Sequence, residues 1–177
     1  MNVAVFDLEM TNLKADFGVL ICGCVQPYKG KLKTFQVSQI ESDDSGLVAE
    51  LVEELNQYTV LIAHNGVRFD RPFLNSRAVK WGLPVLNPAG KIYDPVLVAR
   101  RKLNLSYNGL ESIGRFLGCK HKKFETVGNL WLRAALDHDV DALDSIVKHC
   151  QADVVMLTEV AERLEPLIGM INSWGSA

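Results

Sequence analysis

Two carboxylates stand two residues apart at the end of the first apolar segment of the chain. Asp7 and Glu9 follow the Val- and Phe-rich residues 2–6. Side chains in an extended strand alternate between its two faces, so both carboxylates point to the same side. Like charges held this close are unfavourable unless a cation or a proton neutralises them, which favours a divalent metal site. A solvated strand end is the alternative that this pair alone leaves open.

A third acid, Asp70, follows an Asn-Gly pair. Asn65 and Gly66 come directly after the apolar residues 59–63, and they predict a tight turn that brings Asp70 to the start of a helix. The helix dipole favours a negative charge at that position. An ordinary acid at a helix N-terminus therefore remains the alternative for Asp70 taken by itself.

His149 and Asp153 are four residues apart in a long segment of helical periodicity. This spacing places both side chains on one helix face, where a metal ligand and a proton-handling group could address the same site. Such a pair is more often a surface interaction. Val154, Val155 and Leu157 nevertheless indicate that this part of the helix is buried, and an unpaired acid on a buried face is costly.

The elements that must position these side chains follow from hydrophobic periodicity. We expect strands at residues 2–6, 18–26, 31–37, 59–63 and 91–93. We expect helices at residues 47–57, 68–80, 95–102, 107–117, 130–136 and 140–164. The first three strands predict an antiparallel meander, and the fourth, which follows a helix, predicts a parallel and buried neighbour. The expected fold class is α/β, with a mixed five-stranded sheet flanked by helices.

The chain as a whole is typical of a soluble globular protein. It has 177 residues, of which 48% are hydrophobic and 23% charged, and no repeat or linker divides it, so we expect a single domain over residues 1–177. No apolar segment approaches the ~20 residues that cross a bilayer, and no signal-peptide pattern opens the chain. We therefore expect no membrane insertion and a cytoplasmic location.

Charge and cysteine content narrow the chemistry further. The formal net charge of -2 gives no overall basic surface. That argues mildly against a DNA-coating protein, but less against a nuclease, in which bound cations restore positive potential. The four cysteines form no paired Cys-x-x-Cys motif, so we expect them to be reduced and those at 22 and 24 to fill the core.

Taken in order, these motifs resemble the DEDD superfamily, the proofreading-type 3′-to-5′ exonucleases with a ribonuclease H-like fold. The family's Asp-x-Glu motif is matched by Asp7 and Glu9, its Asn-Gly turn followed by Phe-Asp by Asn65, Gly66, Phe69 and Asp70, and its last acid by Asp153. The segment Ile92-Tyr93-Asp94 resembles the family's intervening strand and acid. The ordered set covers most of the chain.

The resemblance implies hydrolysis of phosphodiester bonds with two metal ions. It implies that Asp7, Glu9 and Asp153 hold the catalytic ion, that Asp7 bridges to the second ion, and that Asp70 completes the set. Carboxylate ligands favour Mg²⁺ or Mn²⁺, and the absence of Cys and His ligand spacing argues against zinc.

The resemblance also implies where the nucleic acid binds. The residues expected to contact the terminal nucleotide are Met10, Thr11, Asn12, Leu13, Asn65 and Phe69, with Leu13 as an apolar wedge. Single-stranded 3′ ends are the easiest fit, because their bases can splay and stack. Candidate phosphate contacts are Arg68, Arg71, Arg77, Lys80, Arg100, Arg101, Lys102 and the segment 120–123. A solvated helix face is the alternative for most of these basic side chains.

His149 departs from both branches of this family. One branch has a tyrosine four positions before the last acid, and the other has a histidine five positions before it. Here a histidine stands four positions before Asp153, and Lys148 occupies the position of the second branch's histidine. His149 is therefore a candidate for accepting the proton of the attacking water or for orienting that water.

Two other functions stay open from the sequence. The first is a nucleic-acid or protein-binding module that keeps the fold without the chemistry, against which the four acids argue. The second is an endonuclease of the same fold, such as a ribonuclease H or a junction resolvase. The choice between DNA and RNA as substrate is open as well.

Overall fold

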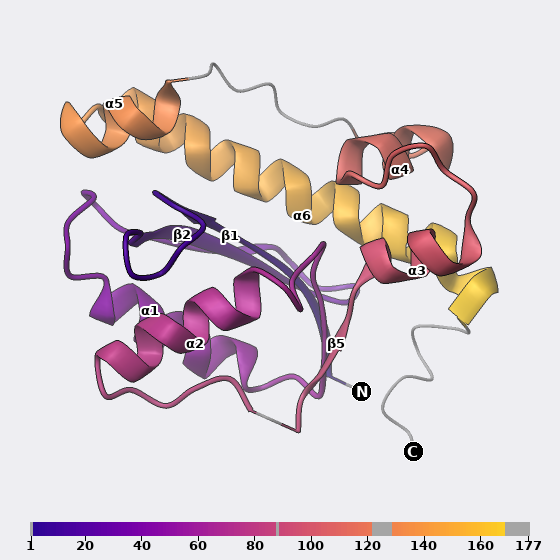
Figure 1. Cartoon of the computed structure of the whole chain (residues 1–177), viewed down its shortest axis with the longest axis horizontal. Coiled ribbons are helices and arrows are strands. Elements are labelled where there is room, and N and C mark those ends of the chain that lie inside the picture. The colour runs from indigo at the N-terminus through magenta and orange to yellow at the C-terminus, as the bar shows by residue number, and fades with distance from the viewer. Residues whose placement is uncertain (1, 88, 122–128, 169–177) are drawn as a thin grey trace.

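One mixed sheet organises the computed structural model, which describes residues 2–87, 89–121 and 129–168 (Figure 1). In these ranges the strands are β1 (Val3–Met10), β2 (Leu20–Pro27), β3 (Lys33–Gln36), β4 (Val60–Ile62) and β5 (Lys91–Tyr93). Their order in the sheet is β3-β2-β1-β4-β5. The pairs β1–β2 and β2–β3 are antiparallel, whereas β1–β4 and β4–β5 are parallel. The expected meander and the expected parallel strands are both confirmed.

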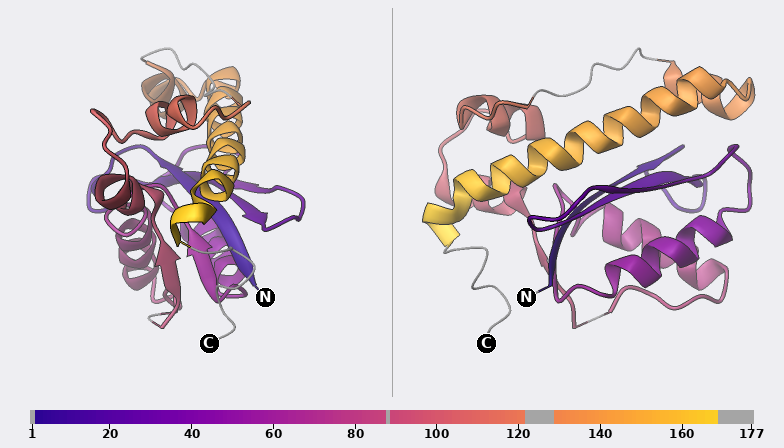
Figure 2. Two further views of the ribbon diagram at one scale, coloured as in Figure 1. Left: turned by 90° about the vertical axis from the view of Figure 1, so that its right-hand side faces the viewer. Right: turned by 180° about the vertical axis from the view of Figure 1, so that it is seen from behind.

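Helices cover both faces of the sheet. They are α1 (Ser45–Leu55), α2 (Asp70–Lys80), α3 (Pro95–Lys102), α4 (Leu110–Phe116), α5 (Leu130–Leu136) and α6 (Val140–Ile168). The long helix α6 crosses one face, and α1 and α2 cover the other (Figures 1 and 2). None of the described helices combines the length and the apolar character needed to cross a bilayer.

Strand β1 separates two hydrophobic cores. Ala4, Phe6 and Leu8 pack with the core of α1 and α2, whereas Val3 and Val5 pack with the core under α6. The strand was expected to end at residue 6 but continues to Met10, because β2 pairs along its whole length. The alternation therefore continues as well, and residues 7 and 9 lie on the α6 side of the sheet.

Arg77 belongs to a buried network, and its expected role as a phosphate contact is wrong. Its Nη2 donates to Asp44 Oδ1 at 2.7 Å, and Trp81 Nε1 donates to the same oxygen at 2.7 Å. Asp44 also accepts the Leu20 amide at 2.8 Å, and Arg77 Nη1 donates to the Ala15 carbonyl at 3.2 Å. A buried ion pair avoids a large desolvation penalty only when it is hydrogen-bonded in this way. The network joins α1, α2 and the loop between β1 and β2.

The loop that leaves β1 is closed by its own hydrogen bonds. The Thr11 amide donates to the Val19 carbonyl, and the Val19 amide donates to Thr11 Oγ1, both at 3.0 Å. The Lys14 amide donates to Asn12 Oδ1 at 2.9 Å. A Cβ atom at Gly18 would lie 2.4 Å from the Asn12 carbonyl oxygen, so the closed loop requires glycine there. This rigid loop begins one residue after the end of β1.

Candidate active site

The site begins on β1, where small thiol side chains let α6 approach the sheet. Asp7 lies opposite Cys24 and Glu9 lies opposite Cys22 in the β1–β2 register. Cys150 of α6 is fully buried above them, and its thiol donates to the Asp7 carbonyl at 3.4 Å. The three cysteines are free and buried, which agrees with the expectation for residues 22 and 24. This contact fixes α6 directly over the two acids of β1.

The Asn-Gly turn after β4 delivers the third acid. Asn65 has a positive φ of 64°, a conformation that asparagine tolerates better than most residues. A Cβ atom at Gly66 would lie 2.3 Å from the Ala63 Cβ, so only glycine fits the tight coil that follows. The chain then enters α2 with Asp70 as its first residue.

Asp94 holds this turn in place from β5. Its Oδ1 accepts the Asn65 amide at 2.9 Å and the Val96 amide at 3.0 Å. The second bond caps the start of α3, whose first residue is Pro95. One buried carboxylate therefore connects the end of β5, the start of α3 and the turn that leads to Asp70.

Asp70 is buried against the backbone of β1. Burial raises the pKa of its carboxyl to about 7; hydrogen bonds from its own amide and the Leu8 amide oppose this shift, and the charge of Asp94 adds to it. The Leu8 contact links the start of α2 to β1 between residues 7 and 9.

The pKa of Asp7 depends on its burial and on the other three acids. Burial raises the pKa of its carboxyl well above the ordinary value, and the charges of Asp70, Glu9 and Asp153 raise it further, in that order. The four acids come from β1, α2 and α6, and residues 7 and 153 are separated by most of the chain. The fold thus makes them electrostatic neighbours.

His149 lies between two of these acids. Its Nε2 is 3.7 Å from Glu9 Oε1 and 3.7 Å from Asp153 Oδ2, and all three side chains are largely buried. These separations exceed hydrogen-bond length, but they lie within ion-pair range for a protonated imidazole. A ring nitrogen of His149 is therefore directed into the carboxylate cluster.

The donor set suits a hard divalent cation. In the described ranges, no three His, Cys, Asp or Glu side chains already have the geometry to hold a metal ion. The four acids nevertheless offer only carboxylate oxygens, the ligands that Mg²⁺ and Mn²⁺ prefer. Burial is the main cause of the raised pKa of Asp7, and the repulsion by the other acids, which raises it further, is what a cation would offset.

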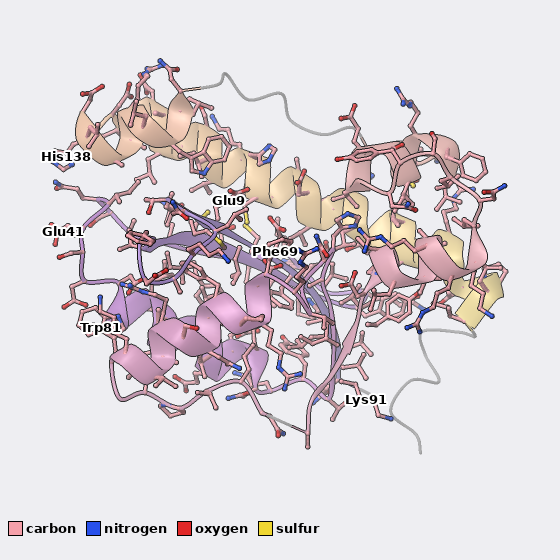
Figure 3. The ribbon with its side chains drawn as sticks, in the orientation of Figure 1. Glu9, Glu41, Phe69, Trp81, Lys91 and His138 are labelled. Atoms are coloured by element: carbon pink, nitrogen blue, oxygen red, sulfur yellow. The ribbon has the colours of Figure 1, made fainter. Side chains whose placement is uncertain are left out.

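The residues expected to contact the terminal nucleotide differ in exposure. Met10 packs its side chain into the core of α1 and α2, so only its backbone could take part. Leu13, in the closed loop, is 62% exposed. Phe69 is partly buried next to the start of α2, with the Arg68 guanidinium 5.3 Å from its ring centre (Figure 3).

The other expected phosphate contacts are dispersed. Arg71 donates to the carbonyls of residues 87 and 90. Arg101 and Lys102 line an open cavity of about 320 Å³ between β5, α3 and the end of α6. The Lys120 amide donates to Glu159. Residues 122 and 123 lie outside the described residues.

Sequence reasoning missed one aromatic neighbour of His149. Trp131 of α5 contacts the imidazole edge to face, with ring centres 5.9 Å apart and an interplanar angle of 85°. The two residues are eighteen positions apart on different helices, so no local periodicity relates them.

The raised carboxyl pKa values predict a pH-dependent stability in the absence of metal. Between the ordinary pKa of an aspartate and about 7, the folded state keeps a proton on Asp70 that the unfolded state loses. Stability therefore falls as pH rises. We expect the free energy of unfolding in chelator to drop by roughly 2 kcal/mol between pH 5 and pH 8. Urea denaturation across this range measures the drop.

The Asp70→Asn variant should flatten this dependence, with the remaining slope contributed by Asp7. The exposed Glu41 provides the control, because Glu41→Gln removes one acid without changing the cluster. An Asp70→Asn protein with the full wild-type slope would show that Asp70 does not take up the proton.

Comparisons with known proteins agree with this fold. A family model described as RNase_H superfamily matches residues 4–165. A DNA polymerase III of PolC type from Ureaplasma parvum serovar 3 is 28% identical over 132 residues, which cover 71% of this chain and 8% of that protein.

Among solved structures, the family B DNA polymerase from the hyperthermophilic archaeon Pyrobaculum calidifontis is similar with a TM-score of 0.77. It is 18% identical, and the match covers 94% of this chain and 25% of that chain. At this identity the likeness establishes the fold alone. The chain spans a quarter or less of the length of both polymerases.

Proposed function

Since the chain belongs to the RNase H superfamily, we propose that it is a metal-dependent 3′-to-5′ exonuclease that hydrolyses phosphodiester bonds of DNA or RNA. The observation that carries the proposal is the gathering of acids from β1, α2 and α6, with His149 Nε2 3.7 Å from both Glu9 and Asp153. Burial, followed by the charges of Asp70, Glu9 and Asp153, raises the pKa of Asp7 at this place. Four carboxylates that destabilise one another have no structural advantage. They do have a function if divalent cations bind among them.

The residues divide by their position in the cluster. Asp7, Glu9 and Asp153 would hold one Mg²⁺ or Mn²⁺ ion, and Asp7 and Asp70 would hold a second. When bound, two such ions activate a water molecule and stabilise the leaving oxygen of an in-line displacement.

His149 would manage the proton or the orientation of the attacking water. Its Nε2 is equally far from Glu9 and Asp153, so the ring nitrogen is directed at the place where these carboxylates converge. A neutral imidazole at this position can accept a proton as the water attacks.

The loop after β1 would bind the 3′ end of the nucleic acid. It starts one residue beyond the end of β1, it is closed by its own hydrogen bonds, and it exposes Leu13 to solvent. An exposed apolar side chain of this kind can pack against the last base of a single strand, whose bases are free to splay. Both relatives are DNA polymerases by name, so DNA is the first substrate to test.

Degradation of end-labelled nucleic acids tests the proposal. Single- and double-stranded DNA and RNA carrying a 5′ label are incubated with Mg²⁺, Mn²⁺ or chelator. We expect a ladder that shortens from the 3′ end, only when metal is present, and fastest on single strands. A strand blocked by a 3′-phosphate and a circular single strand serve as matched controls.

Each alternative function has its own outcome in this assay. Cleavage of the circular strand would identify an endonuclease. Binding of the labelled strand without cleavage in either metal would favour a module that has kept the fold without the chemistry. Undiminished cleavage in chelator would contradict the role assigned to the carboxylates.

A further inference from the structure

Helix α5 brings an indole ring against His149. In Figure 1, α5 lies beside the N-terminal part of α6, whereas α3 and α4 lie along its C-terminal half. The Trp131 ring meets the imidazole at 85° with ring centres 5.9 Å apart. This is the edge-to-face arrangement that aromatic rings prefer. His149 therefore has carboxylates on one side and an aromatic ring on another.

The turn between α5 and α6 fixes the position of this indole. Asp139 caps α6 by accepting the Ala142 amide at 3.0 Å, and its other carboxylate oxygen accepts Arg133 Nε at 2.9 Å. Arg133 lies on α5, so one carboxylate joins the two helices. Leu130 and Ala134, on either side of Arg133 in the chain, are buried in the core under α6. The ion pair with Asp139 and the burial of Leu130 and Ala134 therefore both hold this seven-residue helix against α6.

The side chains of α5 differ in whether they face His149 or the solvent. Trp131 is partly buried against His149, whereas its neighbour Leu132 is 61% exposed and Leu136 is 69% exposed. The chain therefore offers a matched control, because truncation of Leu132 changes an apolar side chain of the same helix without touching the imidazole.

We propose that Trp131 is a positioning residue, which holds the imidazole of His149 toward Glu9 and Asp153. The inference rests on the proposed function, because it assigns the indole an effect on hydrolysis through His149. The terminal torsion of histidine is broad, so packing decides which way the ring nitrogen points. An edge-to-face contact is strong enough to change the ratio of the two imidazole orientations roughly 2- to 10-fold.

Kinetics on a 5′-labelled single strand in Mg²⁺ test this role. Trp131→Ala should lower kcat roughly 2- to 10-fold with little change in KM. Trp131→Phe, which keeps an aromatic edge, should restore most of the rate, and Leu132→Ala should match the wild type. Circular dichroism melts of each variant confirm that it is folded under the assay conditions.

A double-mutant cycle shows whether Trp131 acts through His149. In the His149→Ala background, we expect Trp131→Ala to lower kcat no further. An equal loss in both backgrounds would overturn the proposal. So would a rise in KM at unchanged kcat, which would make Trp131 a substrate contact instead.

Proton NMR tests the contact without any activity. The carbon-bound imidazole protons of His149, assigned by their loss in His149→Gln, should shift in Trp131→Ala because the indole ring current is removed. Unchanged shifts would disprove the contact and with it the positioning role. If the shifts change but the wild-type protein hydrolyses no nucleic acid, the contact stands and the proposed function fails.

Discussion

Replacement of Asp7 by asparagine is expected to lower hydrolysis roughly 10³-fold or more while the protein stays folded. Asp7 is buried, and the charges of Asp70, Glu9 and Asp153 all act on it, so its carboxylate would belong to the set that holds the metal ions. A metal ion supplies several kcal/mol of transition-state stabilisation, and each 1.4 kcal/mol is a tenfold change in rate. Initial rates on a labelled single strand in Mg²⁺ measure the loss.

The same variant should be more stable than the wild type in metal-free buffer at pH 8. The asparagine side chain keeps the shape of Asp7 but removes both causes of its raised pKa, the burial of a charge and then the repulsion by the neighbouring acids. We expect a gain of about 0.5–2 kcal/mol, of the kind seen when a strained functional site is relieved. Thermal melts in chelator measure it.

Glu41→Gln provides the control for both measurements. Glu41 is exposed and lies well apart from Glu9 in Figure 3, so its loss should change neither rate nor stability. Near-normal hydrolysis by Asp7→Asn would remove Asp7 from the metal-binding set. A rate loss accompanied by an equal loss of stability would show that the substitution damages the fold.

Local periodicity was sufficient to predict the sheet and most helices. The apolar segments at 2–6 and 59–63 and the helical periodicity over 140–164 each depend on residues close in the chain. The structure extends β1 beyond residue 6 because pairing with β2 stabilises the charged end of the strand. The two acids therefore do not mark the end of the strand.

Parts of the candidate site were predictable where the residues concerned are close together in the chain. Spacing alone puts Asp7 beside Glu9 and His149 on the face of Asp153, and the glycine at 66 is required by its close approach to Ala63. The structure brings these separately predicted side chains together. The family resemblance predicted that these side chains meet at one site. Secondary-structure propensity and residue spacing alone could not predict it.

Long-range polar contacts account for what the sequence did not predict. Arg77 looked like one of several basic side chains on a helix face, but it is buried because Asp44, thirty-three residues away, accepts its hydrogen bonds. Trp131 meets His149 only because a turn folds α5 back on α6. In both cases the partner is set by tertiary packing, and a single sequence carries no local signal of it.

His149→Ala is expected to cost roughly 10² to 10⁴ in rate if the imidazole accepts the proton of the attacking water. Its Nε2 lies 3.7 Å from Glu9 and from Asp153, which places this ring nitrogen at the carboxylate cluster. The rate of the wild type should then fall as pH is lowered, because a protonated imidazole cannot accept the proton of the water. Rates are measured at saturating strand in Mg²⁺ and again in Mn²⁺, and a midpoint that moves with the metal does not belong to the imidazole.

His149→Tyr separates proton transfer from orientation of the water. A neutral phenol in this position can orient a water molecule by hydrogen bonding, but it is a poor proton acceptor near pH 7 because tyrosine has an ordinary pKa near 10. If His149 is the base, both variants lose activity and the acid limb of the wild-type pH profile disappears. Substantial activity in His149→Tyr beside a nearly inactive His149→Ala would assign His149 to orientation instead. An alanine variant as fast as the wild type would exclude both roles, and the hydrolysis would then depend on the four carboxylates alone.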